Sequence, residues 1–187
     1  AFSKEHMGIT AENVSRKYTV TRQEQDQYAY QSYLKTYKAQ KNKYFKNELI
    51  KSDYKDQVRS DTTLSKLSQL KAAFKKTGTV TAGNASSLND GAAFLVLASS
   101  DYIKTNKIKP LAKVLDWSAS AGNPDYMGVT PITAIQKLMK KMSVKIGFFD
   151  LIEINEAFAA TSVAVQRSLK IDPNKLNIVG GAIALGH

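Results

Sequence analysis

The sequence of 187 residues contains no cysteine, which excludes a disulfide framework and any metal site built from thiolates. Only His6 and His187 could offer an imidazole to a metal ion, so a metalloenzyme is not expected. No apolar run approaches the ~18 residues that are needed to span a bilayer. Because 43% of the residues are apolar, the chain can form a buried core, and a soluble globular protein of one or two domains is predicted. Ala1 is not an initiator methionine, so we expect the gene to begin upstream.

Acidic residues are scarce, with 16 Asp and Glu against 27 Lys and Arg. The excess is concentrated in residues 1–76, which hold 16 basic and 8 acidic side chains. Such a balance favours anionic partners such as nucleic acid, acidic lipid or a phosphorylated ligand. The alternative for each lysine is a solvated surface position. A basic nucleic-acid module rests on charge alone, because the sequence contains no recognisable nucleic-acid motif.

The first part of the chain is predicted to be helical. Thr21 and Glu24 form a capping box, so we expect a helix over residues 22–43. Its large residues recur at helical spacing and are expected to face the core: Tyr30, Tyr33, Leu34, Tyr37 and Tyr44. Residues 47–66 are polar and are expected to be rich in loops. A short helix is predicted from the spacing of Leu64, Leu67, Leu70 and Phe74, with Gly78 as its left-handed cap.

The second part of the chain alternates between two kinds of pattern. Strands are predicted at residues 92–98, 111–118, 150–154 and 177–179. One helix is predicted to follow Thr130 as N-cap and Pro131 as first helical residue, and another is predicted over residues 155–169. This alternation predicts a layered α/β fold. A change in composition near Ser87 divides the chain into two sub-regions.

Three segments could carry chemistry, and each has a structural alternative. Asn155 can donate a hydrogen bond to a carbonyl or a water without titrating, whereas Asn155 and Glu156 could equally cap a helix. His187 ends a glycine-flanked segment that lets backbone pass close to a substrate, and imidazole suits proton transfer; a lone histidine is also a common structural partner. The small residues 79–91 suit a long, thin, polar ligand or form a tight turn.

Taken in this order, and together with His-Met-Gly-Ile-Thr-Ala-Glu-Asn-Val at residues 6–14, these segments resemble the thiolase family, specifically the short-chain acetoacetyl-CoA thiolases. The resemblance spans nearly the whole chain. It implies an α/β fold of the layered α-β-α-β-α type, present in part, with an α+β loop domain. Residues 1–88 resemble the loop domain that covers CoA, residues 89–110 the end of the N-terminal half, and residues 111–187 the start of the C-terminal half.

The resemblance also implies an activity. Thiolases of this kind join two acetyl-CoA molecules into acetoacetyl-CoA and CoA, or run the reverse thiolysis, through an acetylated cysteine. His187 would activate that cysteine and donate to the oxyanion, and Asn155 would position a water. The family places its two cysteines upstream of Ala1 and downstream of His187, so we expect an internal piece of a longer protein that is inert alone. The alternatives are a longer-chain 3-ketoacyl-CoA thiolase and a carrier that binds acyl-CoA or lipid without catalysis.

The same resemblance assigns contacts to CoA and substrate. They are expected from His6, Met7, Arg59, Phe74, Ala82, Ser86, Met127 and Phe158, with Arg59 at the adenine-phosphate end and Ser86 at the pantetheine. Met127, together with Met7, would limit the acyl chain length by filling volume. A potassium ion is expected near Tyr33 and the backbone of Ala82 and Ala85, unless Tyr33 is simply a packed helix tyrosine.

Apart from potassium, no cofactor is expected, since CoA serves as substrate and product. The expected partners are acetyl-CoA, acetoacetyl-CoA, CoA and further copies of the chain in a dimer or tetramer, with neither nucleic acid nor membrane. An intracellular location is expected, with the cytoplasm favoured over the mitochondrion.

Overall fold

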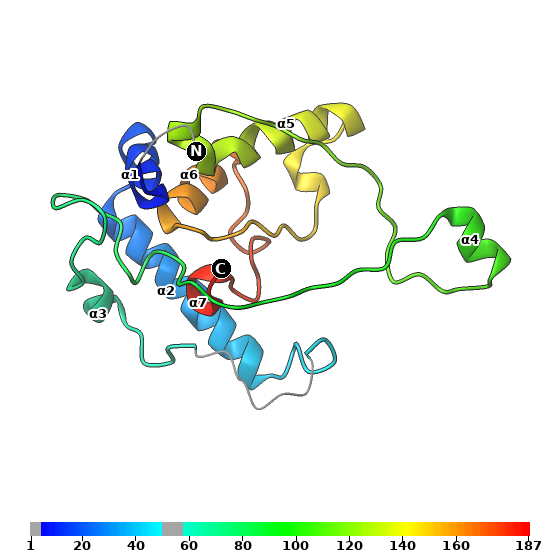
Figure 1. Cartoon of the computed structure of the whole chain (residues 1–187), viewed down its shortest axis with the longest axis horizontal. Coiled ribbons are helices and arrows are strands. Elements are labelled where there is room, and N and C mark those ends of the chain that lie inside the picture. The colour runs from blue at the N-terminus through cyan, green and yellow to red at the C-terminus, as the bar shows by residue number, and fades with distance from the viewer. Residues whose placement is uncertain (1–4, 50–57) are drawn as a thin grey trace.

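The structure, a computed structural model, describes residues 5–49 and 58–187. Within these ranges the chain is mostly helical (Figure 1). The elements in chain order are α1 Met7–Lys17, α2 Arg22–Lys41, α3 Leu64–Ser68, α4 Ser100–Thr105, the 3-10 helix η1 Pro124–Val129, α5 Thr130–Met142, the 3-10 helix η2 Ile146–Phe148, α6 Ala159–Leu169 and α7 Ala182–Leu185.

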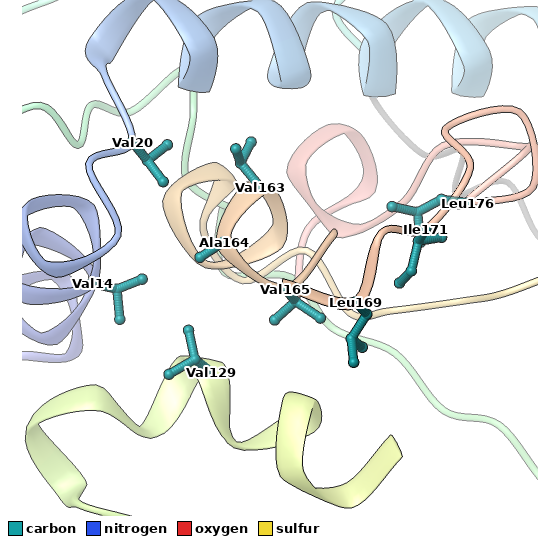
Figure 2. Packing of buried hydrophobic residues seen from close by; sticks show 9 residues of the cluster. All are labelled: Val14, Val20, Val129, Val163, Ala164, Val165, Leu169, Ile171 and Leu176. Carbon is teal, nitrogen blue, oxygen red and sulfur yellow. The ribbon is translucent and has the colours of Figure 1, made fainter. Parts of the chain in front are cut away.

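Three apolar clusters lie among the described residues, and the one with the most residues is built around α6. Val163, Val165 and Leu169 of α6 lie at its centre, with Val14 of α1 and Val129 of η1 on one side. Figure 2 shows α6 between α2 above and the η1 and α5 segment below, with Ile171 and Leu176 packed beside Leu169. Because eight of the 11 residues of α6 are buried, small and medium-sized side chains prevail, with alanine and valine at five positions.

The four predicted strands do not form among the described residues. Only isolated bridges are found, namely Ala72 with Thr81, Ala85 with Phe158, and Ile152 with Leu176. The apolar run at residues 92–98 carries Phe94 and Val96 at 93% and 98% exposure. A strand is stable only when a neighbour takes its backbone hydrogen bonds. No described segment supplies that neighbour. The run at residues 92–98 is therefore unpaired, although its composition is typical of a covered strand.

Helix α2 confirms the prediction for its start and its cap. Thr21 Oγ1 accepts from the backbone N–H of Glu24, and the Glu24 carboxylate accepts from the N–H of Thr21. The predicted core stripe is wrong except at Tyr33 and, in part, Tyr30, because Leu34, Tyr37 and Tyr44 are exposed. The buried side is instead small and polar: Gln25, Asp26, Ala29, Ser32, Thr36 and Ala39. On this side Gln25 donates to Ser15, Asp26 accepts from Asn84 and Ser32 donates to Glu156, bonds that leucine could not make.

Helix α3 is shorter than predicted, since it ends at Ser68 and leaves Phe74 outside. Gly78 is not a left-handed cap. A Cβ at this position would overlap the Glu12 carboxylate, which accepts from the N–H groups of Thr79 and Val80 at 2.8 Å. A larger residue than glycine at position 78 would therefore displace the Glu12 carboxylate.

Two further helix starts differ from the prediction. Val129, not Thr130, is the N-cap of α5, and the Thr130 hydroxyl lies inside the helix and donates to Met127 O. Pro131 lies in the first turn, as predicted. Helix α6 begins at Ala159 with Phe158 as its N-cap, so the four residues from Asn155 onward precede the helix.

Candidate functional site

His187 and Asn155 lie next to each other although 32 positions separate them. Asn155 Nδ2 is 3.4 Å from His187 Nε2, and both side chains are exposed. In this contact Asn155 Nδ2 donates to an unprotonated Nε2, whereas in the tautomer or charge state that protonates Nε2 both groups present an N–H. Two such donors at one point can hold a negatively charged or polarised oxygen.

The backbone of His187 is held by residues 87–89. His187 N–H donates to Ser87 O at 2.7 Å, and Asn89 N–H donates to His187 O at 3.3 Å. The Asn89 side chain donates to Leu185 O at 2.7 Å. Gly186, at φ +94°, has no room for a Cβ beside Asn89. The sequence analysis missed Ser87 and Asn89 as supports for His187; the small-residue segment that contains them was the available signal.

The residue before Asn155, Ile154, is held through its backbone by the side chain of Asn177. Asn177 Oδ1 accepts from Ile154 N–H, and Asn177 Nδ2 donates to Ile154 O, both at 2.8 Å. This double contact replaces the predicted strand at residues 177–179, because Asn177 adopts a left-handed φ of +43°. Helix α6 begins four residues later, so neither Asn155 nor Glu156 is its N-cap, and the capping alternative is wrong.

Glu156 turns away from its neighbour Asn155 into the protein. Its side chain is 1% exposed and accepts hydrogen bonds from Tyr28, Ser32, Asn177 and the backbone of Ile183. Burial raises the pKa of Tyr28, and the charge of Glu156 raises it further. No local sequence pattern indicates this network beyond the acid itself.

The rings of His6, Phe74 and Phe158 form an aromatic row. The His6 ring stacks on Phe74 at 4.8 Å, and Phe74 meets Phe158 edge to face at 6.0 Å. Gly8 admits the row, because a Cβ there would overlap the Phe74 ring. Ser86 N–H and Oγ both donate to Ala157 O, which fixes the small-residue segment next to Phe158. The structure thus brings His6, Phe74, Ser86 and Phe158 together.

The other predicted binding residues lie at the surface. Met7 and Met127 are 51% and 47% exposed, and Arg59 and Ala82 are exposed as well. Their roles stay predictions. Tyr33 is buried among Ala29, Leu67, Ile183 and Ala184, which is the packing of an ordinary helix tyrosine. Burial raises the pKa of Tyr33. The potassium role stays a prediction, and the described residues contain no group of three or more His, Asp or Glu placed to hold a metal.

A hollow of about 750 Å³ lies between α2, α6 and residues 171–176. Neither His187 nor Asn155 lines it, so it is separate from the candidate site.

Comparison with known families matches both parts of the chain. Residues 1–101 match the model for the thiolase N-terminal domain, and residues 108–187 match the model for the thiolase C-terminal domain. The chain belongs to the thiolase family. The finer division of this thiolase chain at residues 88 and 110 stays a prediction.

Curated relatives set the length of this thiolase in context. The chain is 46% identical over 199 residues to proteins described as probable acetyl-CoA acyltransferases from Staphylococcus aureus strains COL and NCTC 8325. The match covers 100% of this chain and 50% of each relative. The chain therefore spans about half the length of the curated relatives it matches.

Solved structures confirm that the chain has part of the thiolase fold. A Bacillus anthracis acetyl-CoA acetyltransferase matches with a TM-score of 0.92 and 42% identity, over 98% of this chain and 49% of that one. A human mitochondrial 3-ketoacyl-CoA thiolase in complex with CoA matches with a TM-score of 0.93 and 42% identity, over 97% and 48%. No helix in the described part of this thiolase is long and apolar enough to cross a membrane.

Proposed function

We propose that this chain forms the oxyanion-binding and CoA-covering part of an acetyl-CoA C-acetyltransferase. The observation that carries the proposal is the 3.4 Å approach of Asn155 Nδ2 to His187 Nε2. Family membership and the acyltransferase descriptions of the relatives support the reaction class.

The reaction needs two cysteines that this chain does not contain. One cysteine thiolate attacks the thioester of the first acetyl-CoA and leaves the acetyl group on its sulfur, while the thiol of the second cysteine gives its proton to the departing CoA and becomes a thiolate. The second cysteine removes a proton from the methyl group of another acetyl-CoA. The resulting enolate attacks the acetyl-cysteine, forms acetoacetyl-CoA and returns the first thiolate. His187 Nε2–H and an Asn155-held water would stabilise the oxygens that become negative in these steps.

The residues around His187 and Asn155 support CoA binding next to them. The row of His6, Phe74 and Phe158 offers an apolar wall to a pantetheine arm, and Ser86 stands at its edge. The basic excess of residues 1–76 complements the phosphate groups of CoA. Met7, Ala82 and Arg59 belong to the same proposed binding surface.

Acyl chain length is the finer part of the proposal. We assign acetoacetyl-CoA as the preferred ketoacyl substrate because Met127 would fill the acyl pocket. The alternative is a longer-chain 3-ketoacyl-CoA thiolase, which one structural neighbour favours by its description and its equal identity of 42%. The Met127→Ala variant distinguishes the two. It should use longer 3-ketoacyl-CoA better, and an unchanged chain-length profile would favour the longer-chain alternative.

The test is thiolysis of acetoacetyl-CoA by the protein as its gene encodes it, with whatever sequence flanks these residues. Turnover that an alkylating agent abolishes is expected. His187→Gln should lower kcat about 10²–10³-fold, whereas His6→Gln should mainly raise KM for the CoA substrate. Absence of turnover, with acyl-CoA still bound, would replace the enzyme by the non-catalytic carrier.

Three further proposals accompany this function. We expect a dimer or tetramer of identical chains, activation by potassium, and an intracellular location. Thiolysis rates with potassium exchanged for sodium test the second of these directly.

A further inference from the structure

The buried carboxylate of Glu156 is the polar group that the proposed chemistry leaves unused. It does not reach the pair formed by His187 and Asn155, although it follows Asn155 directly in the chain. At 1% exposure, an acid of this kind is retained only where several donors satisfy it. Its hydrogen-bond donors come from three separate parts of the chain.

Two donors reach each oxygen of the carboxylate. Oε2 accepts from Ser32 Oγ of α2 at 2.5 Å and from the backbone N–H of Ile183 in α7 at 3.3 Å. Oε1 accepts from Asn177 Nδ2 at 2.9 Å and from the Tyr28 hydroxyl of α2 at 3.2 Å. Glu156 therefore joins α2, the loop that contains Asn177, and α7.

One arm of this junction leads to His187. Helix α7 ends at Leu185, two residues before His187, and its start rests on α2 because Ser32 Oγ also accepts from Gly181 N–H at 3.2 Å. A Cβ at Gly181 would lie 2.8 Å from Glu156 Cδ. A Cβ at Gly180, which has φ +78°, would overlap Thr36 Oγ1. The two glycines bring the backbone close to α2 and to the carboxylate. The approach of this backbone to a substrate stays a prediction.

The other arm leads to Asn155. Asn177 Nδ2 donates to Glu156 and also to Ile154 O, while its Oδ1 accepts from Ile154 N–H. The peptide that precedes Asn155 is thus tied to the same carboxylate as the helix that precedes His187. The two arms therefore end at Ile154 and Leu185, close in the chain to the two side chains that approach within 3.4 Å.

We propose that Glu156 is a positioning residue that sets the separation of His187 and Asn155 by fastening both segments to helix α2. This proposal rests on the proposed function for its catalytic consequence. The geometry requires two acceptors at this point, because four donors converge on it. A glutamine has the same shape, but its amide nitrogen would replace one of the two acceptors and face either Ile183 N–H and Ser32 or Asn177 Nδ2 and Tyr28.

The experiment compares Glu156→Gln with Glu153→Gln in the protein as its gene encodes it. Glu153 is the matched control, since it lies three residues earlier, is exposed and undergoes the same change of charge and shape. Glu156→Gln should lower kcat for acetoacetyl-CoA thiolysis about ten- to a hundredfold, as expected when reacting groups are misplaced by about 1 Å. KM should stay within about twofold. Glu153→Gln should keep both constants.

Amide hydrogen exchange supplies a readout that does not depend on activity. In Glu156→Gln, exchange should rise in the peptide that spans residues 177–187 and stay unchanged in the peptide of α1, with Tm near that of the unchanged protein. Ser32→Ala keeps the carboxylate and removes one donor. It should raise exchange in the same peptide to a smaller extent, and it serves as the second variant where Glu156→Gln does not fold.

The outcomes separate the two proposals. The protein could lack thiolase turnover while Glu156→Gln still raises amide exchange selectively in residues 177–187. This result would contradict the proposed function and support the positioning geometry. Exchange that rises evenly over the whole protein, or kinetics of Glu156→Gln that equal those of Glu153→Gln, would overturn the positioning role.

Discussion

Apolar side chains are buried in the helical body and largely exposed in the segment over residues 88–123. In the body, Leu169 and Val165 are 6% and 1% exposed, packed among other apolar side chains. In the segment, Leu95 and Leu111 are fully solvated or nearly so, and α4 has no buried residue. Figure 1 shows this segment leaving the body, carrying α4 far from it and returning past α5, where Ser118 donates to Ala134 O. The difference lies in the neighbours that each region finds among the described residues.

This contrast shows that an apolar sequence pattern favours burial but does not determine which surface, if any, covers the side chains. The run at residues 92–98 has the composition of a strand covered on both faces. Burial of such side chains is favourable by about 25 cal/mol per Å² of apolar surface, but only where a partner surface exists. Within the described residues the body closes its own core without using this run.

The largest effect is expected from truncating the same residue type in each region. Leu169→Ala should lower the free energy of unfolding of this chain by ~2–4 kcal/mol, because it leaves a cavity in the packed cluster. Leu95→Ala should change it by less than ~0.5 kcal/mol, because the side chain contacts mostly water. Urea denaturation followed by circular dichroism measures both.

A loss above ~1 kcal/mol for Leu95→Ala would break the comparison, since it would mean that the segment is packed in this chain. Repeating the Leu95 measurement in the longer protein sharpens the comparison. A covering partner there would raise the effect of Leu95→Ala into the range expected for Leu169→Ala.

The next effect concerns glycines. Gly180→Ala should destabilise the chain by ~1–3 kcal/mol, because φ is +78° and the new methyl group would overlap Thr36 Oγ1. Gly91→Ala should be neutral within ~0.5 kcal/mol, since no atom lies within 4 Å of its added Cβ. Thermal unfolding of the two variants, recorded under the same conditions, should separate them by several degrees.

Local signals in the sequence predicted those elements that depend on nearby residues. The capping box of Thr21 and Glu24 placed the start of α2 correctly, and Pro131 marked the first turn of α5. Strands at residues 92–98 and 111–118 were predicted and did not form among the described residues, because strand pairing depends on segments far away in the chain. The inner side of α2 was predicted wrongly because Ser32 and Asp26 hydrogen-bond to Glu156 and Asn84, partners that periodicity cannot reveal.

The candidate site divides in the same way. Asn155 and His187 were predicted from the resemblance to a family, and the structure brings them together. Their supports could not be predicted, since Asn89, Asn177 and Glu156 act through contacts over 21 to 128 positions. An asparagine in a loop and an acid near a helix start carry no local mark of such a role.

A smaller effect is expected from Tyr28, which lies in the body. Burial and the charge of Glu156 raise its pKa above the ordinary value of 10.0, so the folded chain holds this proton at a pH where the unfolded chain releases it. Stability from this group is complete below pH ~10 and is lost as the pH rises above that value, by up to ~1.4 kcal/mol per pH unit. Tyr28→Phe should make the alkaline loss of stability shallower in urea titrations between pH 9 and 11. Tyr102→Phe in α4 is the control, and an equal change in both variants would contradict the argument.

The smallest effect compares two N-caps. Thr21 Oγ1 accepts from Glu24 N–H in α2, and Ser99 Oγ accepts from Tyr102 N–H in α4. Thr21→Ala should lower the free energy of global unfolding by ~1 kcal/mol, because α2 is part of the packed body. Ser99→Ala removes an equivalent hydrogen bond and should leave global unfolding unchanged, while amide exchange in residues 100–105 rises. Equal global losses from both variants would mean that α4 unfolds together with the body, and the separation of the two regions would not hold.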